Sequence, residues 1–438
     1  MKRLFEAPMR WFRVVKIAMH LDWFKSQMKQ LSLVLLTACL LVQIAFRAEG
    51  QTQDITCQAG RGEYTFQFSS GTTVSVGPVR NGGFAERACA ASLTWKGNEL
   101  PIATDVDQVG IDVLGADLGF GKPVVAIQVD QSGAGSNRAY QIYSLLKPPH
   151  LLYTIKGAHS YRAADTDLDG HIEIWADDAA AVDGFERLPV ADLDSPPTVV
   201  LRFEKGRLFD VSSQFLAFYD AQITRLRSQF TADDLSRFKR SDGKLSVDIH
   251  QSAEELHRLI RTKISILEII WAYLYSGREQ QAWSSLNELW PAEDVERIRA
   301  AISATHQRGI LSGVDQTRHP APRKHFMKIY DAVDTAVIVS SYNPAGGAPD
   351  SSQAEPPVIQ PKSILLRRPP SSPDGPGPPT NEMVELVVDV AGKVHSAKII
   401  NGSDKPLIEA TAGWHFIPAF RDGRPVACRF RISVGAYK

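Results

Sequence analysis

Prolines are concentrated in one stretch of this chain, and they divide it into parts. Residues 342–381 hold 11 of the 26 prolines in a chain of 438 residues. Proline lacks the backbone N–H that helix and sheet interiors require, so this stretch favours an extended, semi-rigid spacer. At about 3.1 Å per residue it would reach roughly 100 Å. We therefore expect a linker over 319–381, proline-rich from 342, with folded regions on both sides.

The segment after the linker, 382–438, has the pattern of a small α+β domain. Its predicted elements are two strands, a short helix and a third strand. They cover residues 383–390, 394–400, 407–414 and 428–434. Gly392 breaks the two apolar runs and predicts a hairpin, while Asp422-Gly423 is a strong turn signal before the last strand.

Seven residues of this segment have a spacing that resembles the C-terminal domain of TonB-family energy transducers. They are Trp414, Phe416, Pro418, Ala419, Gly423, Pro425 and Val426. The family also places a proline-rich spacer before this domain, but its Tyr-Pro element and first helix are replaced here by Pro369–Gly375. The resemblance, over 382–438, implies a module that offers a sheet edge to a partner, either an envelope protein or an outer-membrane transporter. Trp414 and Phe416 themselves are interpreted as core.

The first 50 residues predict an export signal or an anchor. Leu31–Phe46 is an apolar run that follows a basic region, and Ala48-Glu49-Gly50 offers small residues for cleavage after Gly50. Translation starting at Met28 is an alternative. Two further alternatives stay open, an uncleaved inner-membrane anchor and a lipoprotein box at Leu36–Cys39. We expect an exported protein, periplasmic or secreted, of a bacterial-type envelope, with membrane association through the apolar run if it is retained.

The charge balance bears on which partners the chain can bind, and the cysteines predict which thiols are oxidised. Lys and Arg number 49, and so do Asp and Glu, which argues against nucleic acid because nucleic-acid-binding proteins carry a basic excess. In an oxidising compartment Cys57 and Cys89 are natural disulfide partners, whereas Cys428 is expected to be a buried, unpaired thiol.

Residues 51–225 are predicted to form a β-rich domain. Tyr64–Phe68 and Thr73–Val76 alternate around a polar turn and predict a hairpin. Six later runs predict further strands. They are 124–129, 140–145, 151–155, 172–176, 199–203 and 208–211. Short strands at this spacing suggest a meander, a sandwich or a partial propeller.

One loop of this region carries a pattern typical of a metal site. Its candidate ligands are Asp165, Asp167, Asp169, His171 and Glu173. Carboxylates at loop positions 1, 3 and 5, a turn at Gly170, the carbonyl of position 7 and a carboxylate at position 9 supply the hard oxygen ligands that Ca²⁺ prefers. The stretch 165–173 resembles a single calcium loop of the FG-GAP and VCBS repeat families. A solvated Asp-rich turn is the alternative, and a structural ion is expected rather than a catalytic one.

Residues 226–318 change to helical periodicity. Apolar residues at three- and four-residue steps predict a long helix ending at Gly277, a second closed by Pro291, and a third from Val295. The spacing of Tyr273, Gly277, Ala282 and Leu286 resembles one tetratricopeptide hairpin over 266–290. A solenoid needs about three repeats, so a small helical bundle is expected.

Motifs for catalysis are weak in this sequence. Gly115–Lys122 imitates a phosphate-binding loop, but its glycine spacing is wrong and Pro123 stands where Ser or Thr is needed. The sequence thus predicts a multidomain α+β fold and a non-enzymatic, exported envelope protein with a TonB-like interaction module. The alternative is a secreted, calcium-stabilised β-domain binder or inhibitor whose TonB-like tail only docks it.

Overall fold

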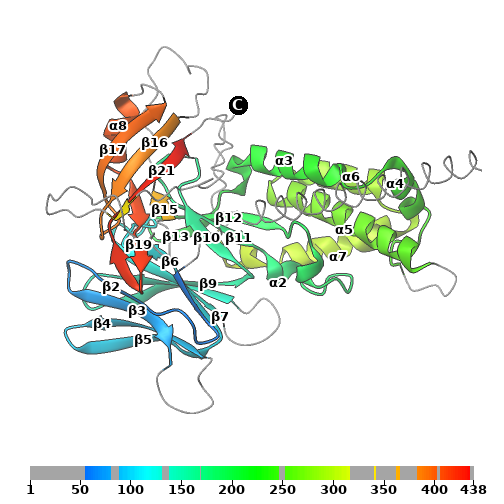
Figure 1. Cartoon of the computed structure of the whole chain (residues 1–438). Coiled ribbons are helices and arrows are strands. Elements are labelled where there is room, and N and C mark those ends of the chain that lie inside the picture. Colours follow the sequence, from blue (N-terminus) through cyan, green and yellow to red (C-terminus); the bar gives the residue numbers. More distant parts are fainter. Residues whose placement is uncertain are drawn as a thin grey trace, which may run out of the picture. The chain divides into compact units, whose positions relative to one another are not determined.

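The computed structural model describes residues 55–79, 88–130, 138–167, 169–245, 252–315, 340–341, 362–365, 382–401 and 405–434. The predicted export signal and most of the predicted linker lie outside these ranges. The described elements all belong to one unit of the chain, Thr52–Lys438, which mixes antiparallel sheets with helices (Figure 1).

The first sheet is an antiparallel meander of four strands. They are β2 (Tyr64–Gln67), β3 (Thr72–Pro78), β4 (Cys89–Trp95) and β5 (Asn98–Val106). The predicted hairpin is β2–β3, in which Phe66 stands opposite Val74 and both side chains are buried. Alternating burial along β3 shows one face turned to the core, as the period of two predicts.

A second sheet of five antiparallel strands contacts the first. It contains β1 (Ile55–Gln58), β6 (Gln108–Leu114), β7 (Val124–Asp130), β8 (Arg138–Ser144) and β9 (His150–Ala158). Contacts of β1, β6 and β7 with β3, β4 and β5 make the pair a sandwich. The predicted disulfide joins Cys57 on β1 to Cys89 on β4 and so links the two sheets, and Cys428 is a buried free thiol, also as predicted.

A third sheet carries the predicted metal loop. Its strands, in order, are β10 (Tyr161–Ala164), β11 (Glu173–Asp177), β12 (Thr198–Glu204) and β13 (Arg207–Asp210). All six later strand predictions correspond to observed strands. β1, β4, β5, β6 and β10 were not predicted. β6 is buried along nearly its whole length and therefore lacks the alternation on which strand prediction depends.

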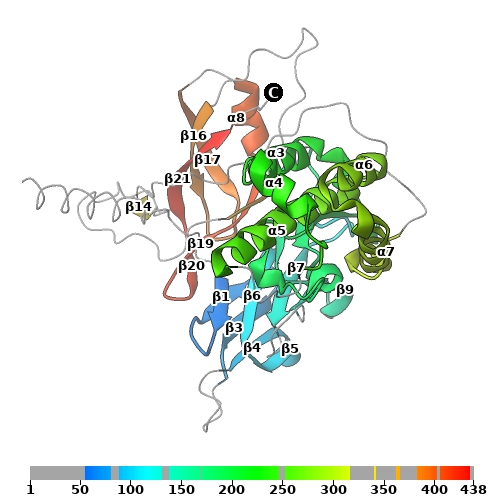
Figure 2. The same ribbon diagram turned by 90° about the vertical axis from the view of Figure 1, so that its right-hand side faces the viewer.

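The helices form a bundle around one long central helix. They are α2 (Ala179–Val182), α3 (Leu216–Arg227), α4 (Ala232–Lys239), α5 (Ala253–Tyr275), α6 (Glu279–Leu289) and α7 (Val295–His306), with short 3₁₀ turns η1 (Val190–Asp192), η2 (Ser212–Gln214), η3 (Ala292–Asp294) and η4 (Ile310–Gly313). α5 packs against α3, α4 and α6 (Figure 2). The three predicted helices are confirmed as α5, α6 and α7, and α3 adds a helix that begins before the predicted boundary at 226. Within the described ranges, no helix combines the length and apolar character needed to cross a membrane.

A buried carboxylate ties the third sheet to this bundle. Asp178, directly after β11, accepts hydrogen bonds from Tyr275 Oη at 2.7 Å and from the Ile310 backbone N–H at 2.9 Å. Burial is the main cause that raises the pKa of Asp178, while these bonds oppose the rise. The end of α5 is thereby fixed against the sheet that bears the metal loop.

The C-terminal segment contains the predicted elements. They are β16 (Glu382–Val388), β17 (Val394–Asn401), α8 (Lys405–Thr411), β18 (His415–Ile417), β19 (Ala419–Arg421), β20 (Arg424–Val426) and β21 (Cys428–Val434). β16, β17 and β21 form an antiparallel sheet over a core with Leu386, Phe416 and Phe430. Gly392 makes the predicted turn at φ 80°, where a Cβ would lie 1.9 Å from the Phe416 carbonyl oxygen.

Two short strands from the predicted linker pair with this segment. β14 (Ser340–Ser341) pairs with β21, and β15 (Lys362–Leu365) pairs with β18. These residues have the extended backbone that the composition predicts, but they are held in ladders rather than in a free spacer. The rest of the linker lies outside the described ranges.

The C-terminal segment also packs directly on the β sandwich. The Thr65 N–H donates to the Gly423 carbonyl at 3.0 Å, and Tyr64 meets Phe420 edge to face at 5.8 Å. His415 Nε2 lies 2.9 Å from the Leu114 carbonyl oxygen, and burial lowers the pKa of His415, so the neutral ring donates this bond. A segment expected at the end of a tether therefore shares a core with the domain before it.

A buried glutamate between α5 and the loop before β12 predicts a pH effect on stability. Glu268 is 1% exposed, accepts the Ser195 N–H at 2.5 Å, and has a pKa raised to about 7 by burial. The unfolded chain ionises this group near its ordinary value, whereas the folded chain keeps the proton up to about pH 7. Stability is therefore lost as pH rises between these values, by about 2 kcal/mol from pH 5 to pH 8.

The measurement is urea unfolding of the wild type and the Glu268→Gln variant at both pH values. The amide keeps an acceptor for Ser195 but cannot ionise, so the variant should lose about 2 kcal/mol less than the wild type. Glu288→Gln, at an exposed position of α6, is the matched control and should follow the wild type. Parallel pH curves for wild type and Glu268→Gln would contradict the prediction.

Candidate metal centre

The loop between β10 and β11 brings acidic residues together because its two strands are adjacent. Ala164 and Glu173 are register partners at the loop end of this hairpin, so Asp165 and Glu173 begin and end the loop side by side. Gly170 has φ 87°, a backbone conformation that favours glycine and lets the loop turn sharply.

Three of the five predicted ligands converge. One carboxylate oxygen from each of Asp165, Asp167 and Glu173 lies within 4.8 Å of the others. Asp165 is 2% exposed and Glu173 is fully buried. Carboxylate oxygens at such separations can face a single cation, and Ca²⁺ takes six to eight oxygen ligands from carboxylates, carbonyls and water.

Backbone N–H groups shape the loop around these carboxylates. The Gly170 N–H donates to Asp165 Oδ2 and the Asp169 N–H to Asp167 Oδ1, both at 3.1 Å. Thr166 donates to Glu173 Oε2 through its N–H at 3.1 Å and its hydroxyl at 3.2 Å. These hydrogen bonds hold the carboxylates of Asp165, Asp167 and Glu173 against backbone groups of the same loop.

Glu173 gives the best test of whether a cation fits. Its Oε1 is buried and, within the described residues, has no hydrogen-bond partner; Arg202 Nη1 lies 3.8 Å away. Burial is the main cause that raises the pKa of Glu173 well above its ordinary value, and the charges of Asp167, Asp165 and Asp169 add to it. A divalent cation would supply this oxygen with a partner and offset the repulsion among the carboxylates, so the residues fit Ca²⁺.

The side chains of the other two predicted ligands, Asp169 and His171, lie outside this cluster. Asp169 Oδ2 lies 3.4 Å from Arg202 Nη1, and its Oδ1 accepts the His171 N–H at 2.8 Å and lies 3.0 Å from His171 Nδ1. The His171 side chain is 58% exposed. The prediction uses the His171 carbonyl rather than its ring, and the Asp169 carboxylate lies outside the cluster of three.

Arg202 is a site residue that the sequence did not indicate. It stands opposite Glu173 in the β11–β12 ladder, is 4% exposed, and also contacts Glu204 at 3.2 Å. One guanidinium faces several carboxylates here, so the loop keeps an excess of negative charge that suits a divalent ion. Only the strand register places Arg202 at the site, and no motif in the sequence marks it.

The stretch Gly115–Lys122, which partly resembles a phosphate-binding loop, contains a carboxylate that binds its backbone N–H groups. Asp117 Oδ1 accepts the N–H groups of Gly119, Phe120 and Gly121 at 2.9, 2.8 and 3.1 Å. These are the donors that a phosphate would require, and a side chain of the same loop already uses them. The stretch Gly115–Lys122 is therefore a turn closed by its own carboxylate.

Comparisons with protein-family models, with curated proteins and with solved structures found no match to this chain. The arguments for its function therefore come from its own residues and geometry.

Proposed function

We propose that this chain is a non-enzymatic, exported protein of a bacterial-type cell envelope. Its C-terminal segment, 382–438, is the TonB-like interaction module and binds an extended segment of an envelope protein or an outer-membrane transporter. Energy transduction would in addition require residues 31–46 to remain as an inner-membrane anchor, because force cannot be transmitted from a protein released into the periplasm.

The observation that carries this proposal is the outer edge of β17. The sheet order is β14-β21-β16-β17, and among the described strands β17 pairs only with β16. A strand at a sheet edge offers backbone N–H and C=O groups to an incoming extended segment. Ile400, near the end of β17, is 38% exposed, and Val390, in the turn that precedes β17, is 51% exposed, so apolar contact is offered beside the edge.

In the same proposal the metal centre has a structural role. Asp165, Asp167 and Glu173 would hold Ca²⁺ and join β10 to β11, which fixes the third sheet against the helices. The ion supplies charge compensation there and no chemistry.

The second candidate is a secreted, calcium-stabilised binder or inhibitor whose C-terminal segment only docks it. The hydrogen bonds from Thr65 to Gly423 and from His415 to Leu114 favour this candidate. They bind one side of the C-terminal segment to the β sandwich of the same chain, so that side is not free for a partner. The two candidates differ in whether the edge of β17 meets another protein.

The test is photocrosslinking in the envelope of a cell that makes the full chain. A photoreactive residue replaces Lys398, exposed on β17, and in a matched variant it replaces Glu99, exposed on the edge strand β5. We expect Lys398 to give an adduct that maps to one extended segment of an exported protein, and Glu99 to give none. Equal adducts from both positions, or none from Lys398, would contradict the interaction module and leave the second candidate.

A further inference from the structure

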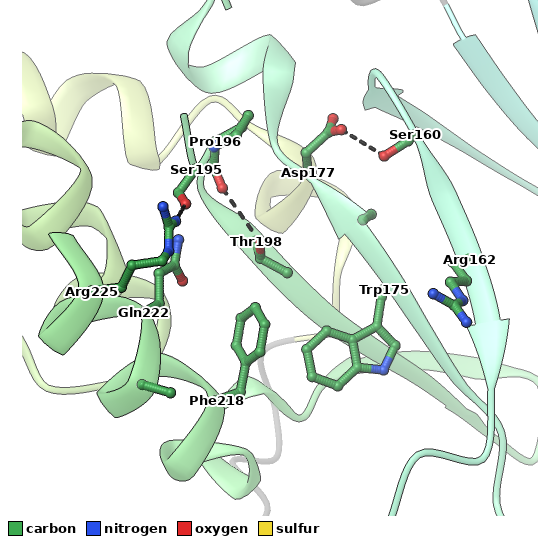
Figure 3. Close-up of a pocket in the computed structure, with 12 residues that line it drawn as sticks. Ser160, Arg162, Trp175, Asp177, Ser195, Pro196, Thr198, Phe218, Gln222 and Arg225 are labelled. Atoms are coloured by element: carbon green, nitrogen blue, oxygen red, sulfur yellow. Dashed lines mark hydrogen bonds between the residues drawn. The ribbon is translucent and has the colours of Figure 1, made fainter. Parts of the chain in front are cut away.

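A pocket of about 480 Å³ lies where the third sheet meets α3 (Figure 3). Its floor is formed by Trp175 of β11 and Phe218 of α3, whose rings pack edge to face at 4.9 Å. Arg162 of β10 stands on one wall and Arg225 of α3 on the other. The metal loop lies outside the set of residues that line this pocket.

Strand register and helix period explain why these side chains meet. Arg162 and Trp175 are directly opposite in the β10–β11 ladder, so both leave the same face of the sheet. Phe218, Gln222 and Arg225 follow one another at steps of four and three residues, which places them on one face of α3. Residues far apart in sequence are thereby gathered around one cavity.

The aromatic floor is held in place before any ligand arrives. Trp175 Nε1 donates to Thr166 Oγ1 at 3.2 Å, and the indole also packs against Phe215 at 5.1 Å. A ring fixed on its polar edge and on one side loses little freedom on binding, which favours affinity.

The charges of the pocket favour an anion. Arg225 donates to the neutral Ser195 hydroxyl, and within the described residues neither Arg162 nor Arg225 forms an ion pair with a carboxylate. Asp177 is the carboxylate of the lining, and it accepts hydrogen bonds from Ser160 Oγ at 2.7 Å and from the His159 N–H at 2.5 Å. Gln222 Oε1 is buried, has no hydrogen-bond partner among the residues that the structure describes, and can accept from a ligand.

We propose that this pocket binds a small anionic ligand with a planar apolar body, of the aromatic carboxylate or aromatic phosphate class. The guanidinium groups of Arg162 and Arg225 bind the anion, and Trp175 and Phe218 pack against the ring. Gln222 accepts a hydrogen bond from a donor on the ligand. The pocket lining contains no residue of β17 and none of the predicted metal ligands.

The test is isothermal titration calorimetry of the full chain with three probes that share one ring system. They are 2-naphthoate, 2-naphthyl phosphate and the neutral 2-naphthamide. We expect one molecule of an anionic probe to bind per chain, at least tenfold more tightly than the amide, and the tighter anion identifies the ligand class. This comparison uses only the wild type, so it does not depend on the folding of any variant.

Substitutions then locate the site. Arg162→Gln and Arg225→Gln should each weaken the anionic probes at least tenfold, whereas Arg240→Gln, directly after α4 and outside the pocket lining, should leave them unchanged. Absence of saturable binding of either anion, equal binding of the amide, or unchanged affinity in both pocket variants would overturn the proposal.

Discussion

Addition of Ca²⁺ to metal-free protein is expected to raise its stability by several kcal/mol. An ion that binds only the folded chain adds about 2.7 kcal/mol when its concentration is a hundred times the dissociation constant. For a domain of about 150 to 250 residues this corresponds to roughly 5–10 °C in the thermal midpoint. The physical reason is the convergence of Asp165, Asp167 and Glu173, whose charges repel one another until a cation lies between them.

Two variants distinguish stabilisation by Ca²⁺ bound at this loop from a general effect of salt on stability. Glu173→Gln and Asp165→Asn should each remove most of the Ca²⁺-dependent rise, measured by scanning calorimetry with and without chelator. Without metal, Glu173→Gln should be at least as stable as the wild type, because it removes a buried ionisable carboxyl that lies beside other carboxylates. Glu288→Gln should keep the full rise, and Mg²⁺, which demands a smaller and more regular shell, should give less of it. A midpoint unaffected by Ca²⁺, or a rise that persists in Glu173→Gln, would show that the loop is a solvated turn.

Loss of the disulfide is expected to have an effect of similar or larger size. Cys57 and Cys89 are 32 residues apart in sequence and both are fully buried. Closing a loop of this length restricts the unfolded chain by on the order of 3–4 kcal/mol in the chain-entropy model. Because the bond joins β1 to β4, its removal also takes away the covalent link between the two sheets of the sandwich.

Denaturant unfolding of the Cys57→Ala/Cys89→Ala double variant measures this effect. Reductant should destabilise the wild type by a similar amount and leave the double variant unchanged. Cys428→Ala controls for the remaining described thiol: burial raises the pKa of the Cys428 thiol to about 12, so it stays neutral and unreactive in the folded protein. A double variant as stable as the wild type would mean that the sandwich does not depend on this bond.

Features with a local cause could be predicted from the sequence. The hairpin of β2 and β3 follows from alternation. The spacing of apolar residues predicts α5, which ends just before Gly277, and α6, which ends just before Pro291. The turn at Gly392 needs a residue without a side chain. The disulfide was predictable because few cysteines were available in a β-rich region. Within the metal loop, the carboxylates that begin and end it could be placed because one hairpin carries them both.

Features that depend on strand register and on contacts between distant segments were decided by the tertiary structure. Arg202 reaches Glu173 only because β12 pairs with β11 in one register, and a shift by one residue would turn it to the other face of the sheet. The pocket of Arg162 and Arg225, the docking of His415 on Leu114 and the pairing of β15 with β18 likewise join residues far apart in the chain. Local sequence sets which face of an element is apolar, but which faces and edges meet depends on packing the whole chain at once, and no short stretch of residues contains that information.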